Sequence, residues 1–260
     1  MRGRGLGWWS SAIGDGCVVK IISYNLRKHS ASGELVALCE RYGVDVLCLQ
    51  ELDTQDMPPA IGELKLADST TRNRLGLAVY YRHDRFEALE TRTFSLKKSL
   101  HDRILTPAHE RLIGTRLYDR EGQRELIVAS FHAAPLTALN SLRRHQIHSA
   151  LGELWQLGPG LPTIMVGDYN YPVFKDNLTN KVREAGYDLT LSDKRTYTRY
   201  KFFRGHFDLA TSVGLDIESV ETLPRGTSDH MPILVTAAYG SDAAALRTSA
   251  SGAVTPDFII

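Results

Sequence analysis

The chain has 260 residues, of which 43% are hydrophobic and 23% are charged, a composition typical of an ordered globular protein rather than a disordered, collagen-like or coiled-coil chain. Its formal net charge is +1, so a site for nucleic acid or phosphate would have to be a local patch of cations. No apolar run approaches the ~18 residues that a membrane-spanning helix needs.

By composition the chain divides into a leader, one long domain and a tail. Residues 1–17 lack the apolar core of a secretory signal and the cysteines suggest no disulfide framework, so we expect a cytoplasmic protein, with Trp8 and Trp9 of a partly ordered leader packing on the domain. No linker divides residues 18–239, which predict one domain. Residues 240–260 are small and polar and predict a flexible tail.

The first predicted elements form a strand–helix–strand unit. A β-branched apolar run over residues 18–23 predicts a strand, apolar residues at helical spacing predict a helix over 33–42, and a second apolar run predicts a strand over 44–49. Parallel strands need a long crossover and are buried on both faces. This order therefore predicts two parallel, buried strands.

The middle of the chain is rich in strands, and a second helix follows it. We expect strands over residues 75–81, 85–94, 112–118 and 125–131. Next come a helix from Leu139 to about Gly158 and strands over 162–167, 207–212, 217–223 and 232–238. A parallel unit at each end of a strand-rich middle predicts an α/β (α+β) fold, a four-layer sandwich of two stacked mixed β-sheets flanked by helices.

Polar side chains lie beside the buried strands at four places. They are Asn25, Gln50 with Glu51, Asp168 with Asn170, and Asp229 with His230. Each alone would more often cap a turn, but strand ends are where side chains from distant segments converge on a rigid frame. Their oxygens, with no cysteine among them, suit Mg2+, Mn2+ or Ca2+ rather than structural zinc, and the histidine adds a base near neutral pH. Together they predict a metal-assisted catalytic site.

Short motifs at these places resemble the endonuclease/exonuclease/phosphatase superfamily, which includes pancreatic deoxyribonuclease, AP endonucleases, inositol polyphosphate phosphatases and neutral sphingomyelinases. The resemblance covers residues 18–239, and Arg143 and Gln146 match the family's central helix. The motifs are Ile22-Ser23-Tyr24-Asn25-Leu26, Leu49-Gln50-Glu51, Ser130-Phe131-His132, Val166-Gly167-Asp168-Tyr169-Asn170, His206-Phe207-Asp208-Leu209 and Thr227-Ser228-Asp229-His230-Met231-Pro232.

The resemblance implies a metal site. Glu51 would be the principal carboxylate ligand, and Asn25 and Asp229 would complete the shell directly or through water. The expected metal is Mg2+, with Mn2+ as a substitute, and its charge would neutralise the phosphate oxygens and the leaving oxygen.

The resemblance also implies a proton relay and a phosphate site. Asp168 and Asn170 would bind the scissile phosphate and help to position or deprotonate the attacking water. His230 would activate that water or stabilise the phosphorane-like charge, while Asp208 would accept its other ring proton and fix the tautomer.

The histidine at position 132 resembles that of the deoxyribonuclease-like and sphingomyelinase-like members of the superfamily. In those members this histidine faces the phosphate and can protonate the leaving group. In the deoxyribonucleases a glutamate on the strand corresponding to residues 75–81 orients it, whereas residues 72–76 here read Arg-Asn-Arg-Leu-Gly. His132 is then either the general acid or, more simply, a hydrogen-bond donor to the phosphate.

Candidate substrate-binding residues are arginines and a lysine. Residues 194–204 hold five basic and four aromatic residues directly before Asp208, a composition that suits single-stranded or flared nucleic acid. The alternative is a hairpin whose aromatic rings pack inward. The candidates in this segment are Arg195, Arg199 and Lys201, and further phosphate candidates elsewhere are Arg72, Arg74 and Arg111.

The sequence thus predicts a divalent-metal-dependent hydrolase of phosphoric esters, foremost a phosphodiesterase or nuclease that cleaves nucleic acid by metal-assisted water attack. The alternative is a phosphatase or phosphodiesterase on a small or lipid phosphate, of the inositol phosphate or sphingomyelin class. A non-catalytic phosphate-binding scaffold is a third reading. The expected partner is a phosphate-containing substrate, with no membrane span and no obligate protein partner.

Overall fold

The computed structural model describes residues 17–55, 57–73, 75–98, 109–171, 175–198 and 205–240, and it places their strands in two sheets. The seven-stranded sheet has the order β12 (Leu215–Thr222), β13 (Ile233–Tyr239), β1 (Val18–Asn25), β2 (Val46–Leu52), β5 (Gly76–Arg82), β4 (Leu64–Ser69) and β3 (Ala60–Ile61). The six-stranded sheet has the order β10 (Asp188–Leu191), β11 (Asp208–Val213), β9 (Thr163–Asp168), β8 (Arg124–His132), β7 (Leu112–Asp119) and β6 (Phe86–Phe94).

Both sheets are mixed, and each contains one of the predicted parallel units. β1 and β2 pair in parallel across the crossover helix α1 (Leu35–Tyr42), which follows the short 3-10 helix η1 (Ser32–Glu34). β8 and β9 pair in parallel across α3 (Asn140–Leu157). The other described pairings are antiparallel.

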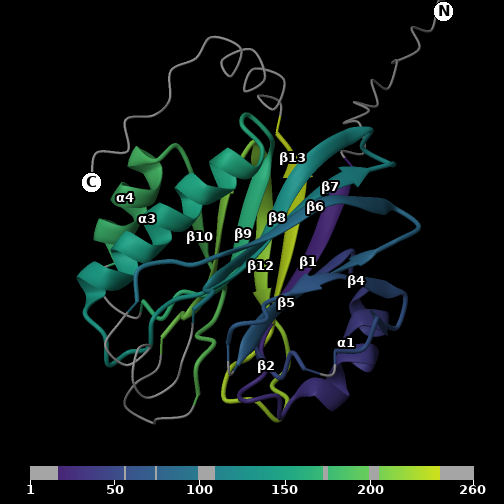
Figure 1. Ribbon diagram of the computed structural model, residues 1–260, viewed down its shortest axis with the longest axis horizontal. Coiled ribbons are helices and arrows are strands. Elements are labelled where there is room, and N and C mark those ends of the chain that lie inside the picture. The colour runs from purple at the N-terminus through teal and green to yellow at the C-terminus, as the bar shows by residue number, and fades with distance from the viewer. Residues whose placement is uncertain are drawn as a thin grey trace, which may run out of the picture.

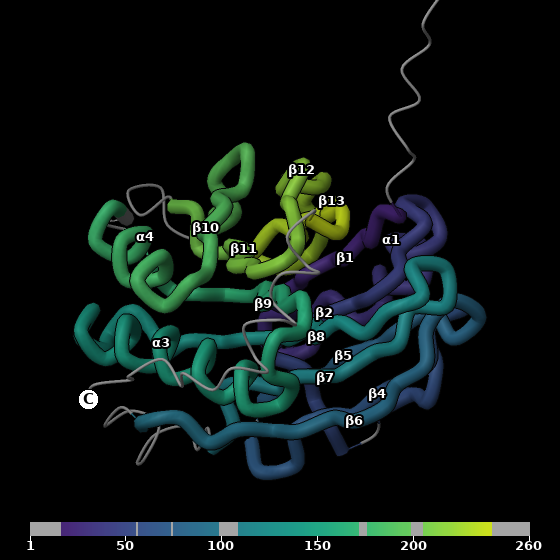
Figure 2. Tube along the Cα trace, turned by 90° about the horizontal axis from the view of Figure 1, so that it is seen from above, coloured from purple at the N-terminus to yellow at the C-terminus, as the bar shows by residue number. Residues whose placement is uncertain are grey.

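The sheets stack face to face with helices on their outer faces. α1 lies on one side of the molecule, whereas α3 and α4 (Lys175–Glu184) lie together on the opposite side (Figures 1 and 2). The inner faces form one apolar core, with Ile21 and Val46 of one sheet packed in the same cluster as Val128 and Ile164 of the other. The prediction of a four-layer sandwich is therefore confirmed.

Burial on both faces explains the continuous apolar runs that identified the central strands. In β1, Val19 and Ile21 point into the core between the sheets, while the alternate residues Ile22 and Tyr24 pack under α1. Successive side chains of a strand point to opposite faces, so a strand covered on both sides needs apolar residues at nearly every position.

Four described elements were missing from the sequence prediction, namely β3, β4, β10 and α4. The β4 strand carries Lys65 and Asp68 and shows only weak alternation of burial. The α4 helix is polar, and its buried apolar residues are Leu178 and Val182, a stripe too narrow to stand out. The predicted leader and tail, apart from Cys17 and Gly240, lie outside the described residues.

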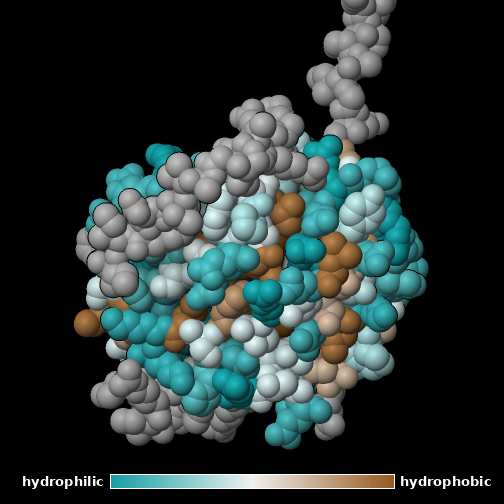
Figure 3. Space-filling view, turned by 45° about the horizontal axis from the view of Figure 1, so that its top comes forward, coloured by the Kyte–Doolittle hydropathy of each residue, from teal (hydrophilic) through white to brown (hydrophobic). Residues whose placement is uncertain are grey.

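The surface is mixed in character. On the face shown in Figure 3, hydrophobic residues lie as separate patches among hydrophilic ones, as on most globular proteins. No helix within the described ranges is long and apolar enough to cross a membrane.

Candidate active site

The register of the sheets brings the predicted polar residues to one end of the sandwich. The parallel pairing of β1 and β2 sets Asn25 opposite Gln50, and that of β8 and β9 sets His132 opposite Asp168. The antiparallel pairing of β9 and β11 sets Asp208 opposite Asp168 as well. Residues far apart in sequence thus meet on rigid strand ends.

Buried hydrogen bonds join the two sheets at this end. Asn25 of the first sheet donates from Nδ2 to Asp168 Oδ2 of the second at 3.1 Å. Gln50 donates from Nε2 to the Ser130 hydroxyl at 2.9 Å, and Ser130 donates in turn to the backbone carbonyl of Leu49 at 3.0 Å. Gln50 and Ser130 belong to the family-like motifs, yet their function as ties between the sheets depends on tertiary contacts that the sequence does not reveal.

A candidate relay runs through the buried groups Asp208, His230 and Asp168, with one hydrogen bond and one longer contact between them. His230 Nδ1 lies 2.9 Å from Asp208 Oδ2, and its Nε2 lies 3.6 Å from Asp168 Oδ2. Burial lowers the pKa of His230, but the Asp208 and Asp168 carboxylates outweigh it and raise that pKa above its ordinary value. Burial raises the pKa of Asp168, against the attraction of His230. The two neighbouring carboxylates thus favour the charged form of the His230 imidazole.

The second histidine has the opposite electrostatics. His132 Nε2 lies 3.6 Å from Asp168 Oδ2 and 3.9 Å from Glu51 Oε1. Burial, together with the positive charges of Arg111 and His230, holds the pKa of His132 well below its ordinary value. These surroundings favour the neutral form of His132, which offers a hydrogen bond rather than a charge.

The backbone at Glu51 and around Asp168 adopts conformations that are unusual or sterically restricted. Glu51 has a φ of 56° and Asn170 a φ of 48°, in the left-handed region that side chains other than glycine rarely adopt. At Gly167, whose φ is 150°, a Cβ atom would lie 1.9 Å from the carbonyl oxygen of Phe131 on the neighbouring strand. Only glycine fits there, and this explains the Gly-Asp-x-Asn motif physically.

The residues at the end of β2 fit a hard metal ion. Glu51 Oε2 accepts the backbone N–H of Lys28 at 3.1 Å, whereas the contacts of Oε1 with the described residues are long, 3.5 Å to Asn25 Nδ2 and 3.9 Å to His132 Nε2. Asp229 is buried, with Oδ2 at 3.7 Å from Arg27 Nε. A carboxylate oxygen with such weak contacts, on a side chain that is 26% exposed, suits Mg2+ or Mn2+.

A second set of groups also has the spacing of a metal site. Asp168, Asp208 and His230 offer ligand atoms within 4.8 Å of one another. The 2.9 Å hydrogen bond already engages His230 Nδ1 with Asp208, and a protonated imidazole does not bind metal. We therefore interpret this set as the relay, and Glu51 as the better candidate for holding a metal ion.

The structure shows that the candidate substrate-binding residues differ in their surroundings. Arg72 and Arg195 are exposed. Arg111 is buried and donates from Nη1 to the backbone carbonyls of His132 and Ala133 at 3.0 and 2.9 Å, so it supports the strand end that carries His132. Arg74, Arg199 and Lys201 lie outside the described residues.

The described part of the basic and aromatic segment packs against the relay. The Tyr197 ring is buried, 5.0 Å from the His230 ring and 4.8 Å from the Phe207 ring. The Thr196 hydroxyl accepts the backbone N–H groups of Phe207 and Asp208. This stretch therefore supports the catalytic groups, and its aromatic ring points inward.

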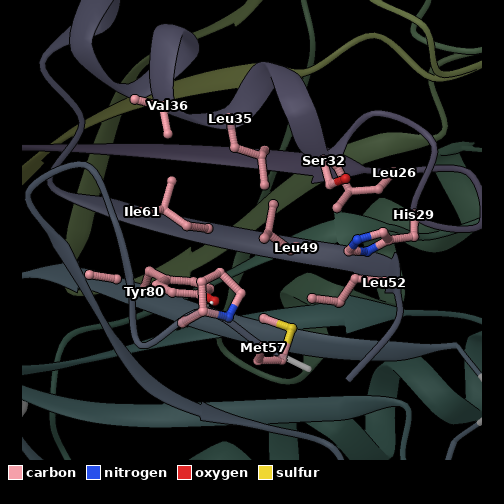
Figure 4. A pocket seen from close by; sticks show the side chains of 12 residues that line it. Leu26, His29, Ser32, Leu35, Val36, Leu49, Leu52, Met57, Ile61 and Tyr80 are labelled. Atoms are coloured by element: carbon pink, nitrogen blue, oxygen red, sulfur yellow. Dashed lines mark hydrogen bonds between the residues drawn. The ribbon is translucent and has the colours of Figure 1, made fainter. Parts of the chain in front are cut away.

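An apolar cavity of about 320 Å³ lies on the opposite face of β2, under α1 and the β3–β4 hairpin. In Figure 4, Leu26, His29 and Ser32 lie at one end of this cavity and Ile61 and Tyr80 at the other. Such a lining has too few polar groups to bind a phosphate, so the cavity is separate from the catalytic site.

Comparison with known proteins identifies the family. The model of the Endonuclease/Exonuclease/phosphatase family matches residues 22–230, nearly all of the sandwich. The chain belongs to this family. Its members hydrolyse phosphoester bonds and typically depend on divalent metal ions, so the resemblance inferred from the motifs is confirmed.

Individual members of the family are distant in sequence. Protein angel of Drosophila melanogaster is 24% identical over 166 residues, which cover 58% of this chain and 45% of that protein, so the chain spans less than half of this relative's length. Mannosyl-6-phosphatase Bt3783 of Bacteroides thetaiotaomicron VPI-5482 is 17% identical with a TM-score of 0.68, over 85% of this chain and all of that one. TDP2 of D. rerio, solved with a single-strand DNA product, is 15% identical with a TM-score of 0.66, over 85% and 99%. These structural likenesses show the fold.

Proposed function

We propose that this protein is a divalent-metal-dependent phosphodiesterase that cleaves nucleic acid by attack of water on phosphorus. The observation that carries the proposal is the buried Asp208–His230 pair beside Asp168, at the same strand ends as the weakly bound Glu51 oxygen. A charged imidazole, a buried carboxylate and a candidate metal carboxylate are the groups that phosphoryl transfer to water requires.

Each group has a distinct part in the proposed reaction. Bound Mg2+ or Mn2+, held by Glu51 with Asn25 and Asp229, would neutralise the charge that develops on the phosphate and leaving oxygens. Asp168 Oδ2 would orient the attacking water and take its proton. His230 Nε2–H would donate to a phosphoryl oxygen, while Asp208 holds the proton on Nδ1 and keeps the ring charged.

Asn170 and His132 complete the site in this proposal. Asn170 donates from its backbone N–H to Asp168 Oδ1 at 2.9 Å and from Nδ2 to Oδ2 at 3.2 Å, which fixes the carboxylate against the water. His132, neutral and near both Asp168 and Glu51, would donate a hydrogen bond to the phosphate on the leaving-group side.

Two observations favour nucleic acid as the substrate. Arg72 and Arg195 are exposed cations, and Arg195 precedes Thr196, whose hydroxyl accepts the Asp208 N–H; exposed cations suit a polyanionic chain. A protein of similar fold, TDP2 of D. rerio, was solved with a single-strand DNA product. A phosphatase on a small phosphate is the second candidate, favoured by the likeness to mannosyl-6-phosphatase Bt3783.

A substrate panel tests the proposal. The purified protein would be assayed with Mg2+, Mn2+ or excess chelator against single-stranded DNA, RNA, mannose 6-phosphate, inositol phosphates and sphingomyelin vesicles. We expect metal-dependent cleavage of an oligonucleotide, with kcat/KM well above that for any monoester. Faster hydrolysis of the sugar phosphate would support the second candidate. Calorimetric Mg2+ binding without hydrolysis of any substrate would support a non-catalytic scaffold.

A further inference from the structure

The loop between β4 and β5 is fastened to the second sheet by a buried glutamate. Glu110 lies just before β7 and is 6% exposed. Its Oε2 accepts the backbone N–H groups of Thr71 and Arg72, both at 3.0 Å, and its Oε1 accepts the Thr93 hydroxyl at 2.7 Å. A carboxylate that receives two successive backbone N–H groups fixes the loop conformation strongly, because charge-assisted hydrogen bonds in a buried site are stronger than neutral ones.

Asn73 of the same loop binds the segment that carries Glu110. Its Oδ1 accepts the backbone N–H groups of His109 and Glu110 at 2.7 and 2.9 Å, and its Nδ2 donates to the backbone carbonyl of Glu110. The side chain of each residue thus binds the backbone of the other's segment. We call this reciprocal pair the Glu110–Asn73 clamp.

The clamp lies between the two halves of the catalytic site. On one side, the loop ends at Gly76, which pairs with Leu52, the residue that follows Glu51. On the other side, Arg111 follows Glu110 and donates to the backbone carbonyls of His132 and Ala133. The clamped loop therefore joins the metal-binding strand end to the strand end that carries His132.

Among the loop residues that the structure describes, Arg72 presents a cation to solvent. Its backbone N–H is held by Glu110, but its side chain is exposed, and its guanidinium makes no hydrogen bond or ion pair with any residue that the structure describes. A rigid backbone beneath an unpaired guanidinium suits recognition of an anion, since little conformational freedom of the backbone remains to be lost on binding.

We propose that Arg72 binds a second phosphate of the substrate, beyond the scissile one, and that Glu110 is a positioning residue that holds Arg72 for this contact. This inference rests on the proposed function and makes it more specific. The substrate must carry at least two phosphates, as an oligonucleotide does and a simple phosphate monoester does not. Glu110 touches neither the substrate nor the reacting atoms in this account.

The test compares a substrate that has several phosphates with one that has a single phosphate. Arg72→Ala is expected to raise KM for a short oligonucleotide about tenfold with little change in kcat, and to leave hydrolysis of bis(4-nitrophenyl) phosphate unchanged. Glu110→Ala is expected to weaken oligonucleotide binding as far as Arg72→Ala does, and the double variant to bind no more weakly than either single variant, because the two residues act as one unit in this contact. Arg183→Ala, on the exposed surface of α4, controls for the loss of one positive charge.

A binding measurement separates this inference from the proposed function. Anisotropy of a fluorescein-labelled oligonucleotide, measured in chelator, should show weaker binding and a shallower salt dependence for Arg72→Ala than for Arg183→Ala, even if the wild-type protein cleaved nothing. If Glu110→Ala does not fold, Glu110→Gln, which keeps the shape and one acceptor, is expected to show an intermediate KM at an unchanged melting temperature. Equal loss on both substrates, additive losses, or wild-type oligonucleotide binding by Arg72→Ala would overturn the inference.

Discussion

At the scale of single residues, the two histidines differ in what surrounds them. His230 has a carboxylate on each ring nitrogen, with Asp208 at 2.9 Å and Asp168 at 3.6 Å. Among the described residues, the carboxylates that contact His132 are Asp168 and Glu51, and both contact Nε2. We therefore expect the same side chain to act as a fixed cation in one position and as a neutral donor in the other.

The pairing of Asp208 with His230 predicts strongly non-additive mutations. Asp208→Asn removes the carboxylate that keeps the ring protonated, so it should lower kcat/KM by roughly a hundredfold or more, nearly as far as His230→Ala does. The double variant should be hardly slower than either single variant, because the residues act as one unit. Steady-state kinetics on one diester substrate provide the check, and multiplicative losses would show that the two residues act separately.

His132 is predicted to be a phosphate donor rather than the general acid. His132→Gln, which retains an N–H donor, should keep appreciable activity, and its defect should be the same for a poor leaving group and for 4-nitrophenolate. The measurement is kcat/KM on both substrates. A defect confined to the poor leaving group would assign the acid role to His132 after all.

At the scale of the elements, close contact between β8 and β9 constrains the end of β9 that carries Asp168. Gly167→Ala would drive a Cβ atom into the Phe131 carbonyl, so it should destabilise the fold by about 4 kcal/mol or more. Gly33→Ala, where the added Cβ atom would meet nothing within 4 Å, is the matched control and should be nearly neutral. Urea unfolding measures both, and a stable Gly167→Ala variant would show that β8 and β9 can move apart.

Sequence patterns predicted the elements that are buried on both faces and the polar residues at their ends. β1, β2, β8 and β9 are continuous apolar runs, so their positions, and those of Asn25 and Asp168 beside them, were predictable. β4 and α4 bury too few apolar side chains to show a strand or helix pattern in the sequence. Support from Arg111 and the Glu110–Asn73 clamp could not be predicted, because both depend on which loops meet once the sheets have stacked.

At the scale of the whole molecule, polar ties join the sheets at both ends of an apolar core. Opposite the catalytic end, the buried Arg85 bonds Asp45 of the first sheet at 3.0 Å and Asp119 of the second at 2.8 Å. Burial acts to raise the pKa of Asp119, but hydrogen bonds, chiefly that from Arg85, lower it overall. The stability that Asp119 contributes is therefore present above its ordinary pKa and is lost as the pH falls through its lowered value.

This remote network predicts a change in stability without a change in catalysis. Arg85→Leu removes the cation that two buried carboxylates share. Asp45 keeps Arg82 at 3.0 Å and Asp119 keeps the Tyr239 hydroxyl at 2.9 Å, so the cost should be about 3 kcal/mol, at the low end for a broken buried ion pair. Urea unfolding at neutral pH measures the loss, and the gap between variant and wild type should narrow as Asp119 becomes protonated in acid. The folded variant should keep the wild-type kcat/KM on a small diester, since the network is remote from the site. Loss of activity in the fully folded variant would show coupling between the two ends.

The central claim is that a divalent metal held at Glu51 is required for phosphoester hydrolysis, and one titration tests it most directly. The kcat/KM of wild type and Glu51→Gln would be measured as Mg2+ is added back after chelation, with Mg2+ binding followed by calorimetry. We predict no wild-type activity in chelator, full recovery with Mg2+, and a loss of about a hundredfold or more in Glu51→Gln together with weaker Mg2+ binding. Full activity in excess chelator, or in Glu51→Gln, would contradict it.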